Sequence, residues 1–428
     1  MSDVWRAVGL KLCVLAVAAA GLGLGVSRAE SDTATWPQFH GPDRDAISEE
    51  TGLLKKWPEG GPPLLWRAEG CGRGYSSLAV TEDAIYTAGA VNEQTCVIRL
   101  DLNGKRRWIA PNGEPWHASD RMRWARAYWG SRATPTVDDG LVYHLGELGR
   151  LAAFDAETGS EVWSRNVLED FGAELPRYGY AESVLIVGDR LIVYPGGKRG
   201  YMVALDKKTG RKIWANTDIG EGASYCSAIQ RRVNGRDQII TMSGDAAIGV
   251  DPTDGRLLWR HPHSHSRRIN ATTPVVRGGM VYITSGYGTG SVGLRVTTSG
   301  GVSATEVWAT DGLDNQHGGV VCLDGYLYGA GHKQVGWTCL ELATGREMWR
   351  ERIIEGGSIA YADGRLYCLG ERGNVALLDP TPDGPKRVSR FKLSQTDNRP
   401  FWAHPVVCRG RLYVRYDDTL FAYDIEAK

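Results

Sequence analysis

Beyond its first 26 residues, the chain has no hydrophobic run long enough to cross a bilayer. The run from Leu12 to Val26 covers 15 residues, short of the roughly 20 that a membrane-spanning helix needs. Arg6 and Lys11 precede it, and Ser27-Arg28-Ala29 follows with small residues at the two positions that define a cleavage site. We therefore expect residues 1–29 to be a signal peptide, with an uncleaved membrane anchor as the alternative. The mature protein is expected to be periplasmic or secreted and not membrane-spanning.

The sequence also lacks an excess of basic charge. It holds 50 Lys and Arg residues against 50 Asp and Glu residues, and without residues 1–29 the balance is 47 against 49. Proteins that bind polyanions in bulk are normally basic. We therefore do not expect nucleic acid as a partner.

Several catalytic and cofactor motifs are missing. The chain has 8 Cys, and the seven outside the signal peptide are an odd number, so they cannot all pair within one chain. We interpret them as small buried hydrophobes. A Cys-x-x-Cys-His haem motif and a Gly-x-Ser-x-Gly nucleophile elbow are both absent. The carboxylates are scattered over turns, so no catalytic acid–base pair is assigned.

Tryptophan is abundant and regularly placed. Seven of the 15 Trp residues recur about 40 to 55 residues apart, at Trp66, Trp108, Trp163, Trp214, Trp259, Trp308 and Trp349. Most of them close a short strand that follows a turn of an acidic residue and glycine. A β-rich repeat of this length is typical of a propeller. We expect each ring to fill the wedge between two neighbouring blades.

Each repeat is predicted to form four strands, as residues 129–163 illustrate with three apolar segments before the strand that ends at Trp163. The last repeat lacks a fourth strand, whereas Leu64-Leu65-Trp66 is a fourth strand without the three before it. Pairing these two remnants would close the ring and remove its free edges. We therefore predict an all-β, eight-bladed propeller of four-stranded antiparallel blades, with seven blades as the alternative. Residues 30–62 are predicted to be an extended segment that packs on the propeller, which occupies residues 63–428.

The repeats resemble those of the pyrroloquinoline-quinone (PQQ)-like β-propeller family, whose motif is Asp-x-x-Thr-Gly-x-x-x-Trp. Complete matches are Asp155 to Gly159 and Trp163, and Asp206 to Gly210 and Trp214. Partial matches end at Trp108, at Trp259 after Asp251, and at Trp349. The resemblance covers residues 63–428 and implies the propeller fold.

The resemblance implies two kinds of function. One branch of the family oxidises alcohols or sugars with bound PQQ and Ca²⁺, and its alcohol-oxidising members carry two adjacent cysteines beside the quinone. Another branch contains non-enzymatic scaffolds, among them the lipoprotein that assists outer-membrane barrel assembly. This chain has no adjacent cysteines. We therefore expect a non-enzymatic binding protein without a cofactor or metal, and keep the PQQ- and Ca²⁺-dependent dehydrogenase as the alternative.

Long connections between predicted blades place basic and aromatic residues around one mouth of the central channel. Guanidinium groups flanked by rings suit carboxylates, acidic sugars or peptides. We therefore predict a protein or glycan ligand on this face of a monomer, although the same residues could simply fold the loops. The candidate residues are Arg121, Arg123, Trp124, Arg126, Trp129, Arg132, Arg267, Arg268, His317, Trp402 and His404.

His261, His263 and His265 form one further pattern. In an extended strand a spacing of two places all three on one face, as a metal site would need. Pro262 interrupts the strand, and no carboxylate lies nearby in the sequence. We therefore do not expect a metal here.

Overall fold

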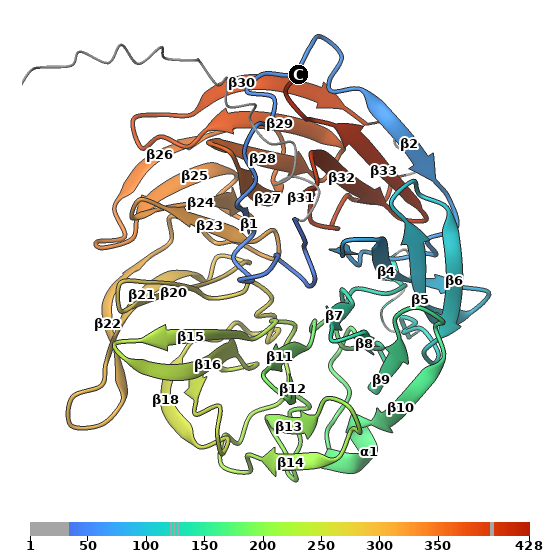
Figure 1. The fold of residues 1–428 in the computed structure, drawn as a ribbon. Coiled ribbons are helices and arrows are strands. Elements are labelled where there is room, and N and C mark those ends of the chain that lie inside the picture. Colours follow the sequence, from blue (N-terminus) through green and yellow to red (C-terminus); the bar gives the residue numbers. More distant parts are fainter. Residues whose placement is uncertain (1–33, 120–121, 123–124, 126–127, 394–397) are drawn as a thin grey trace, which may run out of the picture.

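The computed structural model describes residues 34–119, 122, 125, 128–393 and 398–428. The predicted signal peptide lies outside these residues. Eight four-stranded sheets surround a central axis, and one of them gains a fifth strand (Figure 1). Seven sheets take their four strands from one repeat, and the last combines three strands of the final repeat with Leu64–Ala68. The eight-bladed prediction is confirmed, and seven blades are excluded.

Within a blade, the strands follow each other outward from the axis and pair antiparallel. Blades 1 to 4 consist of β3 (Ala79–Val80), β4 (Ala84–Val91), β5 (Gln94–Asp101) and β6 (Arg106–Pro111); β7 (Thr136–Asp138), β8 (Leu141–Leu145), β9 (Arg150–Asp155) and β10 (Glu161–Asn166); β11 (Leu185–Val187), β12 (Arg190–Val193), β13 (Val203–Asp206) and β14 (Lys212–Ala215); and β15 (Ile229–Val233), β16 (Arg236–Met242), β17 (Ala246–Val250) and β18 (Leu257–Pro262).

Blades 5 to 8 repeat the plan, and two strands from the N-terminal part of the chain join the last two blades. They consist of β19 (Val275–Arg277), β20 (Met280–Ser285), β21 (Gly290–Thr297) and β22 (Ser303–Thr310); β23 (Val320–Leu323), β24 (Tyr326–Gly331), β25 (Gly336–Glu341) and β26 (Glu347–Glu351); β27 (Gly357–Ala362), β28 (Arg365–Gly370), β29 (Asn374–Asp379) and β30 (Lys386–Lys392) with β1 (Ile47–Ser48); and β31 (Val406–Cys408), β32 (Arg411–Tyr416), β33 (Thr419–Asp424) and β2 (Leu64–Ala68).

Tight hairpins between first and second strands explain the Asp-Gly pairs in the sequence. Asp139 and Gly140 both have positive φ, at 49° and 76°. Asp and Gly tolerate this conformation better than most residues, and a two-residue hairpin turn requires it. The only helix in the described part of the chain is α1 (Val167–Phe171), capped by Asn166, so no helix there could cross a membrane.

Strand β2 closes the ring as predicted. It pairs antiparallel with β33, with Trp66 opposite Ala422. The buried Arg415 reinforces the junction, because its guanidinium donates to the carbonyl oxygens of Ser76 and Ala88 in blade 1 at 3.1 and 2.7 Å. These bonds join the last blade to the first, so the two ends of the repeat array support each other.

The repeated tryptophans dock between blades. Trp163 of blade 2 donates from Nε1 to the carbonyl oxygen of Lys207 in blade 3, at 2.9 Å. A Cβ placed on Gly210 would lie only 2.7 Å from the Trp163 ring, so the turn of blade 3 rests directly on it. The same arrangement recurs at Trp66, Trp108, Trp214 and Trp308. The motif is thus an inter-blade contact, which explains why its residues recur.

Three blades depart from this rule. Trp349 of blade 6 donates to the Thr381 carbonyl oxygen at 2.8 Å, but no turn glycine rests on its ring, since no atom lies within 4 Å of a Cβ placed on Gly384. Trp259 donates instead to Gln238 Oε1 of its own blade, at 2.6 Å. In blade 7, Phe391 takes the tryptophan position, and a Cβ on Gly61 would lie 2.6 Å from its ring. Trp57 packs against the same ring with centroids 5.2 Å apart. The N-terminal segment thus supplies the cover that a neighbouring turn gives elsewhere.

The blades define two faces of the ring. The upper face carries the loops between blades and the loops between second and third strands, while the lower face carries the other hairpins. On the upper side, a chain of bonds links consecutive blades: the backbone NH groups of Ser77, Thr134 and Ser183 donate to hydroxyl groups of the next blade, on Thr134, Ser183 and Ser227, at 2.8 to 3.0 Å. These bonds hold together the loops that precede the inner strands of neighbouring blades.

Candidate functional site

Aromatic and charged side chains gather on the upper face, on loops from most of the blades. We call them the upper-face cluster: Tyr75, Tyr128, Arg132, Tyr178, Tyr225, Tyr287, His317, Glu371 and Trp402. All except the buried Tyr75 are partly exposed. The cluster therefore presents a continuous, half-buried surface.

Trp402 lies at one side of this cluster. The Tyr128 ring stacks on it with centroids 5.1 Å apart, and Tyr75 lies 4.8 Å away. Its Nε1 donates to Glu371 Oε1 at 2.9 Å, and His317 Nε2 lies 3.6 Å from the same oxygen. Burial raises the pKa of Glu371, although the Trp402 hydrogen bond opposes the shift. This side of the cluster therefore combines aromatic rings with a carboxyl group.

Arg132 holds the middle of the cluster together. Its guanidinium donates to the carbonyl oxygens of Tyr178, at 3.0 Å, and Tyr128, at 2.5 Å. Burial lowers its pKa, while nearby Glu147 opposes the shift. The Tyr178 ring lies 5.9 Å from that of Tyr225. Arg132 therefore fixes the backbone of two loops and leaves the tyrosine rings facing outward.

Tyr287 forms the opposite side of the cluster. It stacks on His265 with centroids 4.8 Å apart, and His332 meets its edge at 4.6 Å. The Arg267 guanidinium lies 5.3 Å from the ring centroid, and Gln316 donates to the Tyr287 hydroxyl at 2.7 Å. These contacts hold the ring in one orientation beside a positive charge.

Two buried polar atoms of the cluster have no hydrogen-bond partner among the described residues: Tyr75 Oη and His317 Nε2. Leaving such an atom unpaired in a protein interior costs roughly 1–3 kcal/mol. Tyr75 is 7% exposed and lies against Trp402, with Arg132 close enough to influence its pKa. A hydrogen-bonding ligand at this position would satisfy the Tyr75 hydroxyl, although unpaired tyrosine hydroxyls also occur inside the blades, at Tyr143 and Tyr413.

The structure places the predicted rim residues unevenly. Trp402, His317 and Arg132 belong to the cluster, and Arg267 borders it. Trp129 lies nearby under the Arg73 guanidinium, 4.5 Å from its ring centroid. Four predicted residues lie outside the described residues, namely Arg121, Arg123, Trp124 and Arg126.

Two predicted residues have other surroundings. Arg268 is exposed and forms an ion pair with Asp245, with Nε and Oδ1 3.1 Å apart. His404 is buried below the rim, where its Nδ1 lies 2.8 Å from His40 Nε2 and its Nε2 donates to the His317 carbonyl oxygen. His404 is therefore a contact of the N-terminal segment inside the channel.

Most tyrosines of the cluster, and Glu371, were not among the predicted residues. A positional signal could have found some of them, because Tyr75, Arg132, Tyr225 and Trp402 each lie four residues before the inner strand of their blade. Residues at equivalent positions of a propeller point toward a common mouth. The isolated tyrosines of short loops carry no signal until the blades are aligned on their strands.

The described residues do not fit a metal site. His261 lies near Glu306, His263 is buried against Ser285, and His265 stacks on Tyr287. The three histidines therefore face different partners. No group of three or more His, Cys, Asp or Glu side chains in the described ranges is arranged to hold a metal ion.

The cysteines of the described residues also differ from the adjacent pair that the resemblance implies for the alcohol-oxidising PQQ enzymes. The seven described cysteines, Cys71, Cys96, Cys226, Cys322, Cys339, Cys368 and Cys408, are free and buried, and no two are adjacent. Burial raises the pKa of thiols such as Cys71, to about 11, which suppresses their reactivity. We therefore derive no chemistry through a quinone.

A protein-family model described as outer membrane protein assembly factor BamB, PQQ_2, matches residues 93–351. The match covers more than half of the chain. The chain belongs to the PQQ_2 family. Its membership agrees with the Asp-Thr-Gly-Trp repeats and confirms the resemblance to PQQ-like propellers.

The relatives of this PQQ_2 propeller include proteins named as quinoprotein dehydrogenases and proteins named as outer membrane assembly factors. The quinoprotein alcohol dehydrogenase PedH of Pseudomonas putida is 32% identical over 31% of this chain and 23% of its own length. The outer membrane protein assembly factor BamB of Moranella endobia is 23% identical over 58% of this chain and 64% of its own length. The chain thus aligns with only about a quarter of the dehydrogenase.

Solved structures share the fold. BamB from Moraxella catarrhalis superposes with a TM-score of 0.60 at 17% identity, covering 85% of this chain and 98% of that one. The quinohemoprotein alcohol dehydrogenase from Comamonas testosteroni gives 0.59 at 13% identity, covering 94% and 82%. Both kinds of relative have the same propeller, so the fold alone does not choose between them.

Proposed function

We propose that this protein is an exported, non-enzymatic binding propeller that holds a protein partner on its upper-face cluster. The observation that carries the proposal is the group of half-exposed aromatic side chains that converge from different blades around Trp402 and Glu371. Tyrosine and tryptophan combine a large apolar contact with a polar tip, and they dominate binding energy in protein interfaces. The family description, an outer membrane protein assembly factor, supports a protein as the partner.

Site-directed photocrosslinking in cells tests the proposal. A photoreactive phenylalanine analogue replaces Trp129 beside the cluster, and a second protein carries it at Lys105, an exposed hairpin residue of the lower face. We expect protein adducts from position 129 and none from position 105. Adding Trp402→Ala should reduce the adducts at least tenfold, because central aromatic residues contribute about 2 kcal/mol or more to binding.

Tyr75→Phe gives a finer test, since it removes only the unpaired hydroxyl. We expect a several-fold loss of adducts with an unchanged melting temperature. Adducts that resist both Trp402→Ala and Tyr75→Phe would contradict the proposal. Retention on a glycan column that Trp402→Ala abolishes, without protein adducts, would assign the cluster to a glycan.

A second candidate, a PQQ- and Ca²⁺-dependent alcohol or sugar dehydrogenase, is favoured by the relatives named quinoprotein alcohol dehydrogenases. Titration of the purified protein with PQQ, with and without Ca²⁺, distinguishes the two. Saturable binding near one equivalent, together with dye-linked oxidation of an alcohol, would favour the dehydrogenase. We expect neither, because the adjacent cysteines of those enzymes are absent and the described residues offer no metal ligands.

A further inference from the structure

Residues 34–50, which we call the channel segment, lie inside the ring (Figure 1). Both ends of the segment pair with the lower ends of inner strands, at Val80 and Ala362. The segment contacts the inner strand, or the residues that lead into it, in all eight blades. The contacts are Trp36 with Val80, Pro37 with Val137, Arg44 with Val184, Asp43 with Arg231, Asp45 with Arg277, His40 with Gly319, Ile47 with Tyr361, and His40 with His404.

Part of this binding is strand addition. Ile47 and Ser48 pair in parallel with Tyr361 and Ala362 of β27, and Trp36 forms an antiparallel bridge with Val80. The inner strand is an edge of each blade, and its unpaired NH and carbonyl groups can accept a further extended chain. The channel therefore offers backbone edges of the kind that bind peptides.

Two side chains of the segment are fully enclosed. Trp36 is 2% exposed and packs among residues of blades 1 and 8. Arg44 is also 2% exposed, and its guanidinium donates to the carbonyl oxygens of Val184, at 2.9 Å, and Ser183, at 2.5 Å. Nearby Glu182 is buried, which raises its pKa to about 8 despite the opposing charge of Arg44. The channel thus encloses one aromatic ring and one guanidinium group, and these two contacts define which peptide fits.

The backbone of the segment is shaped by the channel. His40, Arg44 and Ala46 have φ values of 64°, 51° and 61°, in the left-handed region that residues other than glycine rarely adopt. Such conformations persist only where the surroundings enforce them. The segment therefore resembles a ligand that has been fitted to a site.

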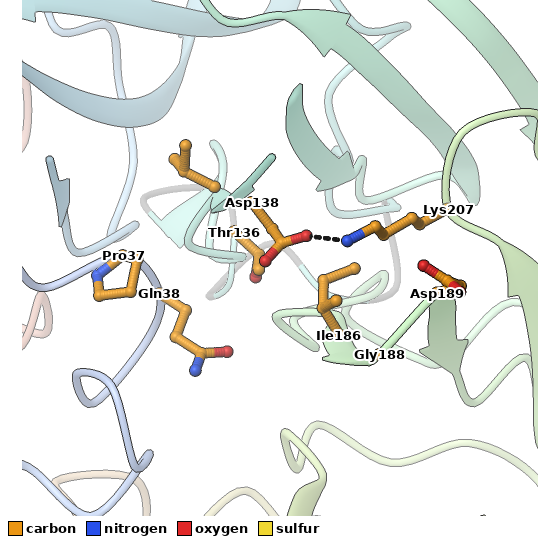
Figure 2. A pocket seen from close by; sticks show the side chains of 9 residues that line it. Pro37, Gln38, Thr136, Asp138, Ile186, Gly188, Asp189 and Lys207 are labelled. Carbon is orange, nitrogen blue, oxygen red and sulfur yellow. Dashed lines mark hydrogen bonds and ion pairs between the residues drawn. The ribbon is translucent and has the colours of Figure 1, made fainter. Parts of the chain in front are cut away.

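The link from the segment to the ring is open. Thr51 and Gly52 are exposed, and no atom lies within 4 Å of a Cβ placed on Gly52. Beside the other arm of the segment, a cavity of about 380 Å³ lies between Pro37 and Gln38 on one side and Asp138, Ile186 and Asp189 on the other (Figure 2). The segment is thus accessible at the lower face and is not sealed in by the blades.

We propose that the channel below its upper rim is a binding site for a looped peptide, occupied by residues 34–50 of this chain, and that this segment exchanges with the same sequence supplied as a separate peptide. The ligand class is a peptide with a tryptophan at one end, an arginine eight residues later and a turn between them. This site reaches from the lower face up to His404, which lies beneath the upper-face cluster. Its contacts differ from those of the cluster, so the proposal does not depend on the function proposed for the cluster.

The test uses the full chain with a protease recognition sequence inserted between Thr51 and Gly52. After cleavage, the N-terminal fragment should stay with the propeller during gel filtration, and the propeller should remain folded. A fluorescent peptide of residues 34–50 should then enter the cleaved protein over hours, and excess unlabelled peptide should displace it. The uncleaved protein should take up at least tenfold less label.

Two peptide variants check the contacts. An Arg44→Ala peptide should compete at least tenfold more weakly, whereas a Glu49→Ala peptide should compete equally, because Glu49 is exposed. Equal competition by the Arg44→Ala peptide would overturn the proposal. So would unfolding upon cleavage, loss of the fragment without uptake of the peptide, or a fragment that never exchanges.

Discussion

Trp163→Ala is expected to destabilise the propeller by about 3–5 kcal/mol, because it removes a docked ring and leaves a cavity between two blades. The substitution also leaves the Lys207 carbonyl oxygen without the indole NH that lies 2.9 Å away. The Gly210 turn, which rests on the ring, cannot move inward without shifting its own blade. Urea unfolding followed by far-UV circular dichroism measures the change.

The neighbouring residue provides a matched control. Val162 precedes Trp163 on β10 and is 49% exposed, so Val162→Ala should change the free energy of unfolding by less than about 0.5 kcal/mol. Trp163→Phe should give an intermediate loss, since it keeps a ring but not the hydrogen bond. An unfolding midpoint that is unchanged in Trp163→Ala would show that the ring does not join the blades.

The propeller could be predicted because the motif that forms its main inter-blade contact recurs many times in the sequence. Five docked tryptophans, Trp66, Trp108, Trp163, Trp214 and Trp308, lie against a turn glycine of the next blade, as Trp163 does against Gly210. A local motif therefore encodes a tertiary contact, and its repetition gives the blade count. Ring closure was also predictable, since Leu64-Leu65-Trp66 and the incomplete last repeat fit only each other.

The course of the channel segment could not be predicted from the sequence. Its contacts join residues far apart in the chain, such as His40 with His404, and each occurs once. Its left-handed residues include Arg44 and Ala46, which show no local preference for that conformation. Composition indicated an extended chain near the propeller, but only the eight inner strands together define the path inside it.

The candidate site was predictable only in part, for a related reason. Arginine- and tryptophan-rich loops indicated the upper face, and they supplied Arg132, His317 and Trp402. Glu371 and Tyr75 lie in short loops with ordinary composition, and they become recognisable through their contact with Trp402. Residues that converge from different blades can be found only once the blades are arranged in space.

Acidification from pH 7 to pH 5 is expected to produce a second large loss of stability, because several histidines are buried in the neutral form. Burial lowers the pKa of His144, His263 and His317 to about 4 and that of His404 to about 3. It also lowers the pKa of His40 well below its usual value.

Hydrogen bonding supports neutral imidazoles at these positions. His404 Nε2 donates to the His317 carbonyl oxygen, so in the neutral ring its Nδ1 accepts from His40 Nε2 at 2.8 Å. His144 Nδ1 accepts from the Asn112 amide at 2.9 Å. A proton on either Nδ1 would place two donors face to face.

The sign of the pH dependence follows from these shifts. Below pH 6.5, the usual histidine pKa, these histidines bind protons in the unfolded chain but not in the folded protein. The free energy of unfolding therefore decreases as the pH is lowered. Each histidine with a folded pKa near 4 contributes a loss of about 2 kcal/mol at pH 5. Glu182 has the opposite effect. Burial raises its pKa to about 8, so its charged form destabilises the folded protein at pH 7, and protonation at lower pH removes that destabilisation. The raised pKa values of Glu147 and Glu371 act in the same direction as Glu182. Five histidines outweigh these carboxyl groups, so we expect a net loss of several kcal/mol.

Thermal unfolding midpoints at pH 7, 6, 5.5 and 5 measure this dependence. His404→Gln should flatten the curve below pH 6.5 by the equivalent of about one proton, because glutamine can keep a donor and an acceptor without binding a proton. His117→Gln is the matched control, since its side chain is 52% exposed and lies on the surface beside Glu93. Midpoints that stay constant from pH 7 to pH 5 would mean that the channel histidines accept protons in the folded protein. An equal slope for His404→Gln and the parent would remove the His40–His404 pair from the explanation.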